Sequence, residues 1–278
     1  MKTIYNSFII SIIAILLTSF NYRTSDNIKS VILKTGDNKA TPELLNQSSG
    51  IISARLNSYG LKSFEIKVAA DKSEIEVRVP DNTNLSEIEG LFTSGGELSF
   101  YETQVLKGVK GTDRDDSNLT NARIGCTGFE DPGMVAKAEA YLKSENLASS
   151  TRLFWSVKND KSQFCLYALK VDNEGKALMS ASDVEVVSSV PEKDSESSRI
   201  EIKFRKEAAG KWERATGENI NKPIAIVVGN KVFYAPVVRD AIKSGLCEIT
   251  GNMTQKEVGY FLALVNNEPL PLSFKIIR

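Results

Sequence analysis

The stretch that most constrains the fold is IAIVVGNKVFYAPVV, which runs from Ile224 to Val238. Only Gly229-Asn230 separates two apolar runs, and two residues are enough only for a tight turn. Gly and Asn favour such turns because both tolerate a positive φ. We therefore predict a β-hairpin with largely buried strands. The turn and Ala235-Pro236 could also mark a recognition loop, but turn chemistry and the end of an edge strand explain both.

The composition is that of an ordinary globular chain with few of the residues that commonly carry out catalysis. The chain has 278 residues, of which 41% are hydrophobic and 25% charged, so it fits one large domain or two smaller ones. Lys plus Arg and Asp plus Glu both number 35, and this balance argues against a nucleic-acid binder. The absence of histidine excludes the common zinc sites and every His-based triad. We expect neither a cofactor nor enzymatic activity.

Residues 1–24 are predicted to be an export signal. Lys2 precedes an apolar core from Phe8 to Leu17. A spanning helix needs about 20 apolar residues, whereas a signal-peptide core needs about 7–15. Small residues at the usual cleavage spacing are missing after Leu17, so a cleaved signal peptide and a retained signal anchor both stay open. In either case we expect the following residues to work outside the cytoplasm.

Three cysteines, Cys126, Cys165 and Cys247, form no CxxC pair and no metal-ligand spacing. In an oxidising compartment one bridge can form and one thiol is left over. Cys247 alternates with Ile249 in GLCEITG, so we interpret it as a small buried hydrophobic residue. A Cys126–Cys165 bridge stays open.

The first hundred residues predict the order strand, helix, strand, strand, helix, strand. The first helix has Thr41 as its cap, Pro42 in its first turn and Gly60 at its end. FEIKV and EIEVRV alternate apolar and charged residues as a half-solvated hairpin, NLSEIEGLF is a short helix, and GELSFYET is the next strand. Such a series predicts an antiparallel-rich sheet with helices on one face, a ferredoxin-like α+β sandwich.

The chain changes character after Gln104. The next residues are rich in Gly and Asp and predict a long loop. Asp113, Asp115 and Asp116 suggest calcium, but the Gly and Glu of an EF-hand loop are missing, which favours a solvated loop.

The second half predicts further strands and helices. They are a helix at 131–146, a hairpin of RLFWSV and FCLYALKV, a strand RIEIKF, a helix at about 238–244 and a strand CEITG. Thr254 and Glu257 form a capping box for a last helix. Two prolines end it, and LSFKII is a final strand.

The last third contains a series of short motifs: a helix that ends in Thr, an AI pair, a turn, an AP pair, a Gly, an I-x-G strand and an LP pair. They fall on Thr216, Ala225-Ile226, Gly229, Ala235-Pro236, Gly245, Ile249–Gly251 and Leu270-Pro271. In this order they resemble the first periplasmic domain of SecD, a membrane protein, often fused as SecDF, that assists export through the Sec translocon.

The front half resembles the family's R-x-N-x-x-G segment and the strand that ends in Pro. The residues are Arg55, Asn57, Gly60 and Pro80. Arg55 and Asn57 could bind a ligand, but tying down the base is the favoured interpretation. The resemblance covers most of residues 43–275 and is weakest between 103 and 180.

The resemblance implies a fold class of α+β, with a ferredoxin-like base and an inserted α+β head that contains the hairpin. We expect the base at 28–103 and 253–278 and the head at 104–252. In the family, transmembrane helices follow the LP pair and couple proton flow to movement. This chain ends at Arg278, so only binding and scaffolding are carried over.

The predicted function is that of a non-enzymatic periplasmic module, soluble or anchored by its N-terminal segment. The expected partner is an exported polypeptide or a Sec-type translocon component. An aromatic-rich surface of the head is the candidate binding site, although core packing is the alternative for most of its members. These residues are Phe154, Trp155, Phe164, Tyr167 and Tyr234. The alternative function is a structural protein of the cell envelope that reuses the fold without an export role.

Overall fold

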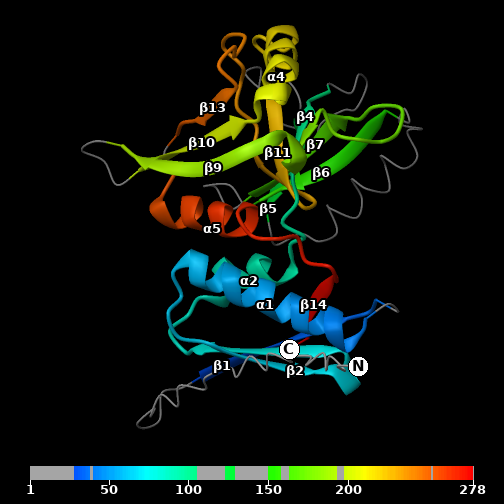
Figure 1. The fold of residues 1–278 in the computed structure, drawn as a ribbon, viewed down its shortest axis with the longest axis vertical. Coiled ribbons are helices and arrows are strands. Elements are labelled where there is room, and N and C mark those ends of the chain that lie inside the picture. The colour runs from blue at the N-terminus through cyan, green and yellow to red at the C-terminus, as the bar shows by residue number, and fades with distance from the viewer. Residues whose placement is uncertain are drawn as a thin grey trace, which may run out of the picture.

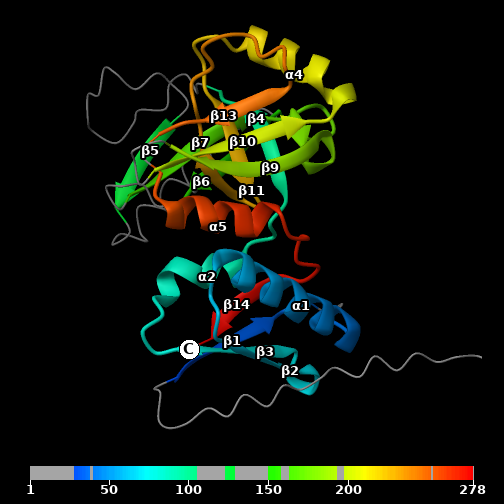
Figure 2. The ribbon, with the colours of Figure 1, turned by 60° about the vertical axis from the view of Figure 1, so that its left-hand side comes forward.

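The protein has two lobes, a base and a head, stacked along its longest axis (Figures 1 and 2). The computed structural model describes residues 28–37, 40–104, 123–128, 150–157, 163–192, 197–251 and 253–277, with the backbone alone at 123–128 and 163–164. The predicted export signal, the Asp-rich loop at 113–116 and the predicted helix at 131–146 lie outside these residues. No helix in the described ranges is long and apolar enough to cross a membrane.

The base is a four-stranded antiparallel sheet with two helices on one face (Figure 1). Its elements are β1 (Ile28–Thr35), α1 (Pro42–Tyr59), β2 (Glu65–Ala69), β3 (Glu74–Pro80), α2 (Leu85–Thr93) and β14 (Phe274–Ile277), with a 3-10 turn, η1 (Ala70–Lys72), between β2 and β3. The spatial order is β14-β1-β3-β2. Numbered along the base this is 4-1-3-2, which is the arrangement of the predicted ferredoxin-like sandwich.

Local signals explain the base elements. β3 buries Ile75, Val77 and Val79 under the helices, while the charged residues between them lie on the other face. The side chain of Thr41 accepts a hydrogen bond from the backbone of Leu44 at 3.3 Å and begins α1. At the other end Gly60 has a φ of 95°, a left-handed conformation that glycine adopts without strain.

The head contains a seven-stranded sheet, a three-stranded sheet and the helix α4 (Lys206–Glu218). The large sheet has the order β5-β7-β6-β12-β11-β4-β8, and the small one has the order β13-β10-β9. The strands are β4 (Leu98–Glu102), β5 (Arg123–Gly128), β6 (Thr151–Ser156), β7 (Gln163–Lys170), β8 (Met179–Ser180), β9 (Val184–Pro191), β10 (Ser198–Phe204), β11 (Ile224–Val228), β12 (Lys231–Tyr234) and β13 (Leu246–Ile249); η2 (Ala181–Asp183) joins β8 to β9.

The hairpin predicted from IAIVVGNKVFYAPVV is β11 and β12, joined at Gly229-Asn230. Gly229 has a φ of 61°, and Asn230 is not among the residues with positive φ. A positive φ at the first turn position alone is what a type II′ turn requires, so the turn does not need the second unusual residue that we expected. All of β11 is buried, whereas only Val232 of β12 is. The expectation of buried strands is therefore correct for β11 alone.

The strand GELSFYET does not join the base sheet as predicted. As β4 it pairs with β11 and β8 in the head, where Phe100 lies opposite Ile226. The fourth place in the base sheet belongs to β14 at the end of the chain. The physical reason is that β4 buries residues on both faces, including Phe100 and Tyr101, and only the head sheet covers both faces of this strand.

The helix predicted at 238–244 is also absent. This segment is an irregular loop whose backbone groups bond to other segments instead of to their own turn. The Val238 N–H donates to the Lys222 carbonyl at 3.0 Å, and the Ile242 N–H donates to the Thr216 hydroxyl at 2.8 Å. With its donors satisfied in this way, the loop does not need helical hydrogen bonds.

The helix α5 (Gln255–Val265) lies between base and head (Figure 2). It contacts α1 and α2 on the base side and β9 and β10 on the head side. The predicted capping box is present, with Thr254 and Glu257 each bonded to the other's backbone N–H. Phe261 is fully buried at this junction. One hydrophobic core thus runs through both lobes and makes α5 part of each.

Candidate functional site

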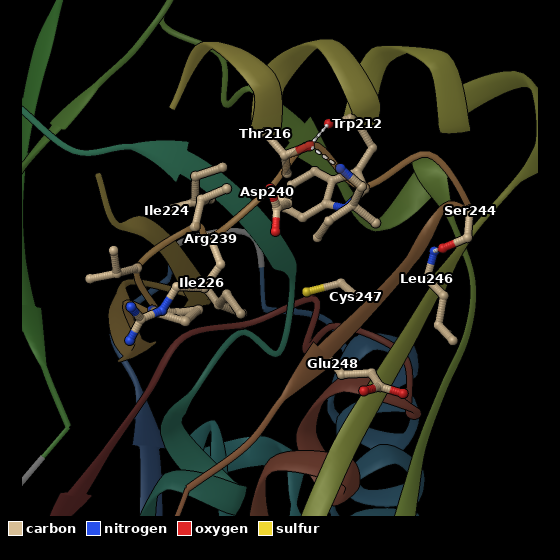
Figure 3. A pocket seen from close by; sticks show the side chains of 14 residues that line it. Trp212, Thr216, Ile224, Ile226, Arg239, Asp240, Ser244, Leu246, Cys247 and Glu248 are labelled. Carbon is tan, nitrogen blue, oxygen red and sulfur yellow. Dashed lines mark hydrogen bonds between the residues drawn. The ribbon is translucent and has the colours of Figure 1, made fainter. Parts of the chain in front are cut away.

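The head contains a pocket of about 420 Å³ on the side where α4 faces β11 and β13 (Figure 3). Its wall is the loop that replaces the predicted helix. The lining residues are Trp212, Thr216, Ile224, Ile226, Pro236, Val237, Val238, Arg239, Asp240, Ile242, Ser244, Leu246, Cys247 and Glu248.

The pocket is apolar inside and charged at its mouth. Ile224, Ile226 and Cys247 are buried, whereas Arg239 and Glu248 are exposed. The mouth contains both signs of charge, so it does not select strongly for a cation or an anion. Such a cavity suits an uncharged apolar group, and its volume lies at the lower end of the roughly 300–1,000 Å³ of ligand pockets.

Helix α4 supplies the two polar groups nearest the interior. Trp212 and Thr216 are four residues apart and therefore share one face of the helix. The Thr216 hydroxyl donates to the Trp212 carbonyl at 2.8 Å and accepts the Ile242 N–H at 2.8 Å (Figure 3). Thr216 therefore connects the wall loop to α4, and its one O–H donor is used within the chain.

Trp212 packs against other aromatic rings but leaves its polar atom unused. Its ring lies 4.6 Å from that of Phe204 and 5.5 Å from that of Phe100, centroid to centroid. The side chain is 2% exposed, and its Nε1 atom has no hydrogen-bond partner within the described part of the chain. A buried N–H without an acceptor is uncommon in proteins.

Cys247 lines the pocket as a free thiol. Burial raises its pKa to about 12, so the thiolate is scarce near neutral pH and the group is a poor nucleophile. Cys165 is disulfide-bonded. The backbone of Cys126 lies directly opposite that of Cys165 in the β5–β7 register.

The five aromatic residues predicted as a binding surface lie in different surroundings. Tyr167 is 6% exposed, and Phe154 is half-buried with its ring 5.4 Å from that of Tyr101. Trp155 is half-buried, and the side chain of Phe164 lies outside the described residues. Tyr234 faces α5 instead, 5.5 Å from Phe261. Core packing, the alternative for this group, accounts for Tyr167 and Tyr234, and none of the four members whose side chains are described lines the pocket.

Three of the family-motif residues line the pocket, and two of the glycines lie in turns. Thr216, Ile226 and Pro236 are lining residues, and Gly229 and Gly245 have φ angles of 61° and 67°. Asn57, Gly60, Gly251 and Pro271 are exposed, and Pro80 ends β3.

Arg55 connects the segments that join the two lobes. It is fully buried in α1, and it donates to the carbonyls of Leu91, Ser94, Gly95 and Glu268 at 2.7–3.3 Å. Burial lowers its pKa to about 10, so it remains charged near neutral pH. A ligand role for Arg55 has no support, because both of its Nη atoms donate to backbone carbonyls of the chain itself.

Sequence reasoning missed Trp212 and the wall residues of the pocket. The signal for Trp212 was available, since Ala208, Trp212 and Ala215 recur at helical spacing and predict the buried face of α4. The wall could not be found in this way, because its contacts with α4 join segments that no local pattern links.

Fold and pocket together define a class, a two-lobed α+β domain with an apolar pocket in its outer lobe. Within the described ranges no group of three or more potential ligating side chains could hold a metal ion. Nor does the pocket contain a nucleophile paired with a base.

Comparison with known proteins shows which proteins this domain is similar to. The family model described as SecDF, P1 head subdomain, matches residues 155–272. The chain is 26% identical over 236 residues to protein translocase subunit SecD of Petrotoga mobilis, covering 84% of this chain and 45% of that protein. It is 33% identical over 78 residues to protein translocase subunit SecDF of Thermus thermophilus, covering 28% of this chain and 11% of that protein.

A solved structure of SecDF, described as a membrane component that enhances protein export, is also similar. It has 19% sequence identity and a TM-score of 0.48, with 90% of this chain and 98% of that chain covered. The resemblance to the first periplasmic domain of SecD and SecDF is confirmed by the family match and the SecD relatives. The chain spans less than half the length of these curated relatives.

Proposed function

We propose that this chain is a non-enzymatic, extracytoplasmic binding module of protein export, and that it holds an apolar part of an unfolded polypeptide in the head pocket. The observation that carries the proposal is the apolar cavity of about 420 Å³ within the subdomain that matches the SecDF head. An extended polypeptide exposes the apolar side chains that such a cavity accepts, whereas a folded protein buries them.

The chemistry of the pocket supports binding and gives no support to catalysis. The interior offers aliphatic side chains, an indole and a thiol whose pKa burial raises to about 12. General acid–base or nucleophilic catalysis would need an activated group within hydrogen-bond reach of a partner. A holding function needs only shape and apolar surface.

Binding to an extended probe tests the proposal. The full chain is titrated into a fluorescein-labelled polypeptide that is reduced and alkylated so that it cannot fold, and anisotropy is recorded. Val237→Trp fills the pocket mouth, where Val237 is 42% exposed. Val186→Trp makes the same substitution on β9 at a site that is 50% exposed and outside the pocket lining.

We expect micromolar or weaker binding that Val237→Trp weakens at least about fivefold and Val186→Trp leaves unchanged. Equal loss in both variants, or no binding by the unaltered chain, would contradict the proposal. Binding of a folded envelope protein in place of the unfolded probe would instead support a structural role without export.

A further inference from the structure

The strand β13 forms an open edge of the small head sheet. It pairs with β10 on one side, and the order β13-β10-β9 places no described strand on the other. The Phe204 N–H donates to the Gly245 carbonyl at 2.8 Å, one position beyond the end of the β10–β13 register. Because bonded and unbonded pairs alternate along an antiparallel ladder, Leu246 and Glu248 direct their N–H and C=O groups away from β10.

Three of the four backbone groups on this edge have no hydrogen-bond partner among the described residues. The Leu246 N–H donates to the Ser244 hydroxyl at 3.2 Å. The Leu246 carbonyl and the N–H and carbonyl of Glu248 make no hydrogen bond within the described part of the chain. They follow one another along the edge as acceptor, donor and acceptor, which is the pattern that another extended backbone matches when it joins a sheet edge.

The pocket borders this open edge. Leu246, Cys247 and Glu248 are consecutive, and all three line the cavity (Figure 3). Neighbouring side chains on a strand point to opposite faces of the sheet. Cys247 is buried in the same core as the lining residues Ile224 and Ile226, whereas Glu248 is exposed on the other face. The cavity therefore meets β13 at its edge and extends from there toward the core.

From these observations we infer that the pocket takes its polypeptide as an added strand on β13. The three backbone groups bond to the main chain of an extended segment, which can run parallel or antiparallel to β13. The residue opposite Cys247 then has its side chain on the same face as Cys247 and enters the pocket, while its two neighbours point to the outer face. The substrate class is thus an extended segment with one apolar side chain between two solvent-facing residues. This inference rests on the proposed function and adds backbone pairing to it.

The opposite edge of the same sheet provides a contrast. Residues of β10 bond alternately to β13 and β9, which leaves Val187, Ser189 and Pro191 of β9 pointing away from the sheet. The Val187 carbonyl accepts the Asn266 side-chain amide at 3.1 Å, and Pro191 has no N–H. The pocket lining contains no residue of β9. Ser189 thus has an outward N–H on an edge without a cavity.

The variant Glu248→Pro tests the pairing. It removes the outward N–H and places a ring where the added strand would lie, but it leaves the bonds between β13 and β10 in place. Ser189→Pro makes the same change on β9 and is the matched control. The probe is a blocked, uncharged peptide, acetyl-Ser-Thr-Leu-Thr-Ser-amide, and its binding is measured from the amide signals of the ¹⁵N-labelled full chain.

We expect the peptide to move the Glu248 amide proton downfield. Glu248→Pro should weaken binding at least about three- to tenfold, the effect of one lost hydrogen bond, and Ser189→Pro should leave it unchanged. If Glu248→Pro binds equally well while Val237→Trp blocks the peptide, the inference is overturned and the proposed function stands. The same holds if the unfolded probe binds and the peptide does not. If neither binds the unaltered chain, both are overturned.

Methylated peptides test the pairing on the unaltered chain, so that the result does not depend on how well Glu248→Pro folds. In an antiparallel added strand both threonine N–H groups face β13 and the leucine N–H points away, and in a parallel strand the reverse holds. One peptide carries an N-methyl group on leucine, the other on both threonines. We expect one of them to bind at least about fivefold more weakly and the other to retain its affinity. Retention by both, or equal loss in both, would overturn the inference.

Discussion

The guanidinium of Arg55 lies 3.1 Å from the backbone carbonyl of Glu268, a residue 213 positions further along the chain. The same side chain bonds to Ser94 and Gly95, where the chain leaves the base for the head. Arg55 thus ties the outgoing and returning connections to α1. Its partners are all carbonyls, so the fit depends on the fork of donors that arginine alone provides.

Replacing Arg55 should destabilise the protein strongly. In Arg55→Met the buried carbonyls lose their donors, and we expect the free energy of unfolding to fall by about 3 kcal/mol or more in urea titrations. Arg55→Lys should lose nearly as much, because one ammonium cannot reach all four carbonyls. Asn57→Ala, at an exposed position on the same helix, should stay within about 0.5 kcal/mol of the unaltered chain. A fully stable Arg55→Lys variant would contradict this account.

Replacing Gly96 or Gly50 by alanine should change the stability of the protein in opposite directions. Gly96 has a φ of 90°, and an added Cβ would lie 2.1 Å from Nη2 of Arg55, so Gly96→Ala should cost about 2 kcal/mol or more. Gly50 lies exposed inside α1, and an added Cβ would meet nothing within 4 Å. Gly50→Ala should therefore stabilise the protein by about 0.5–1 kcal/mol. Thermal unfolding of both variants shows whether each substitution raises or lowers the stability. A change in the same direction for both variants would contradict the prediction.

The structural role of Arg55 was predictable, because the family resemblance includes this residue. The helices and the hairpin of the base were predictable, because they rest on short local patterns. That β4 belongs to the head sheet and not to the base sheet was not predictable in this way. An alternating strand after a helix fits either sheet, and the choice depends on β11, which lies more than 120 residues further on.

The pocket shows the same limit. Four of the five aromatic residues that sequence reasoning chose lie between positions 154 and 167, whereas Tyr234 lies 67 positions after Tyr167. Tyr167 and Tyr234 pack in two different core regions. The pocket instead combines α4 with a loop that local propensity assigned to a helix. Its geometry depends on single long-range bonds, such as the one from Ile242 to Thr216, which leave no periodic trace in the sequence.

The bond between Thr216 and Ile242 predicts how the pocket wall can be loosened. Thr216→Val removes the acceptor and leaves the Ile242 N–H without it, so we expect faster amide hydrogen exchange at Ile242 and a loss of about 1–2 kcal/mol. Thr216→Ser keeps the hydroxyl and is the control. Exchange at Ile242 that is no faster in Thr216→Val than in Thr216→Ser would contradict the role of this hydrogen bond.

Counting the reactive thiols tests whether the chain contains one disulfide. With Cys165 bonded and Cys247 free, the denatured but unreduced chain should react with one equivalent of a thiol reagent, and the reduced chain with three. Cys165→Ser should lower the free energy of unfolding by about 2–4 kcal/mol, because the bridge restricts the unfolded chain. Three reactive thiols without reductant would show that the bridge does not form. The native chain should react slowly at Cys247, because burial raises its pKa to about 12.

Alkaline pH should weaken the fold through groups that burial keeps protonated. Burial raises the pKa of Tyr260 to about 12, whereas in the unfolded chain it is about 10. A folded pKa above the unfolded value stabilises the protein fully below pH about 10, and this contribution is lost as the pH rises toward about 12. Cys247 follows the same rule from a lower unfolded pKa.

Between pH about 8 and about 10.5 each of these groups should remove about 1 kcal/mol or more of stability. Tyr260→Phe and Cys247→Ala should each flatten the decline measured by urea unfolding, and the double variant should flatten it further. The stability of each variant is compared with its own value at pH about 8. A loss of packing, which lowers stability at every pH, is thereby separated from a change in the pH dependence. A decline of unchanged slope in the double variant would mean that other groups control the alkaline limit.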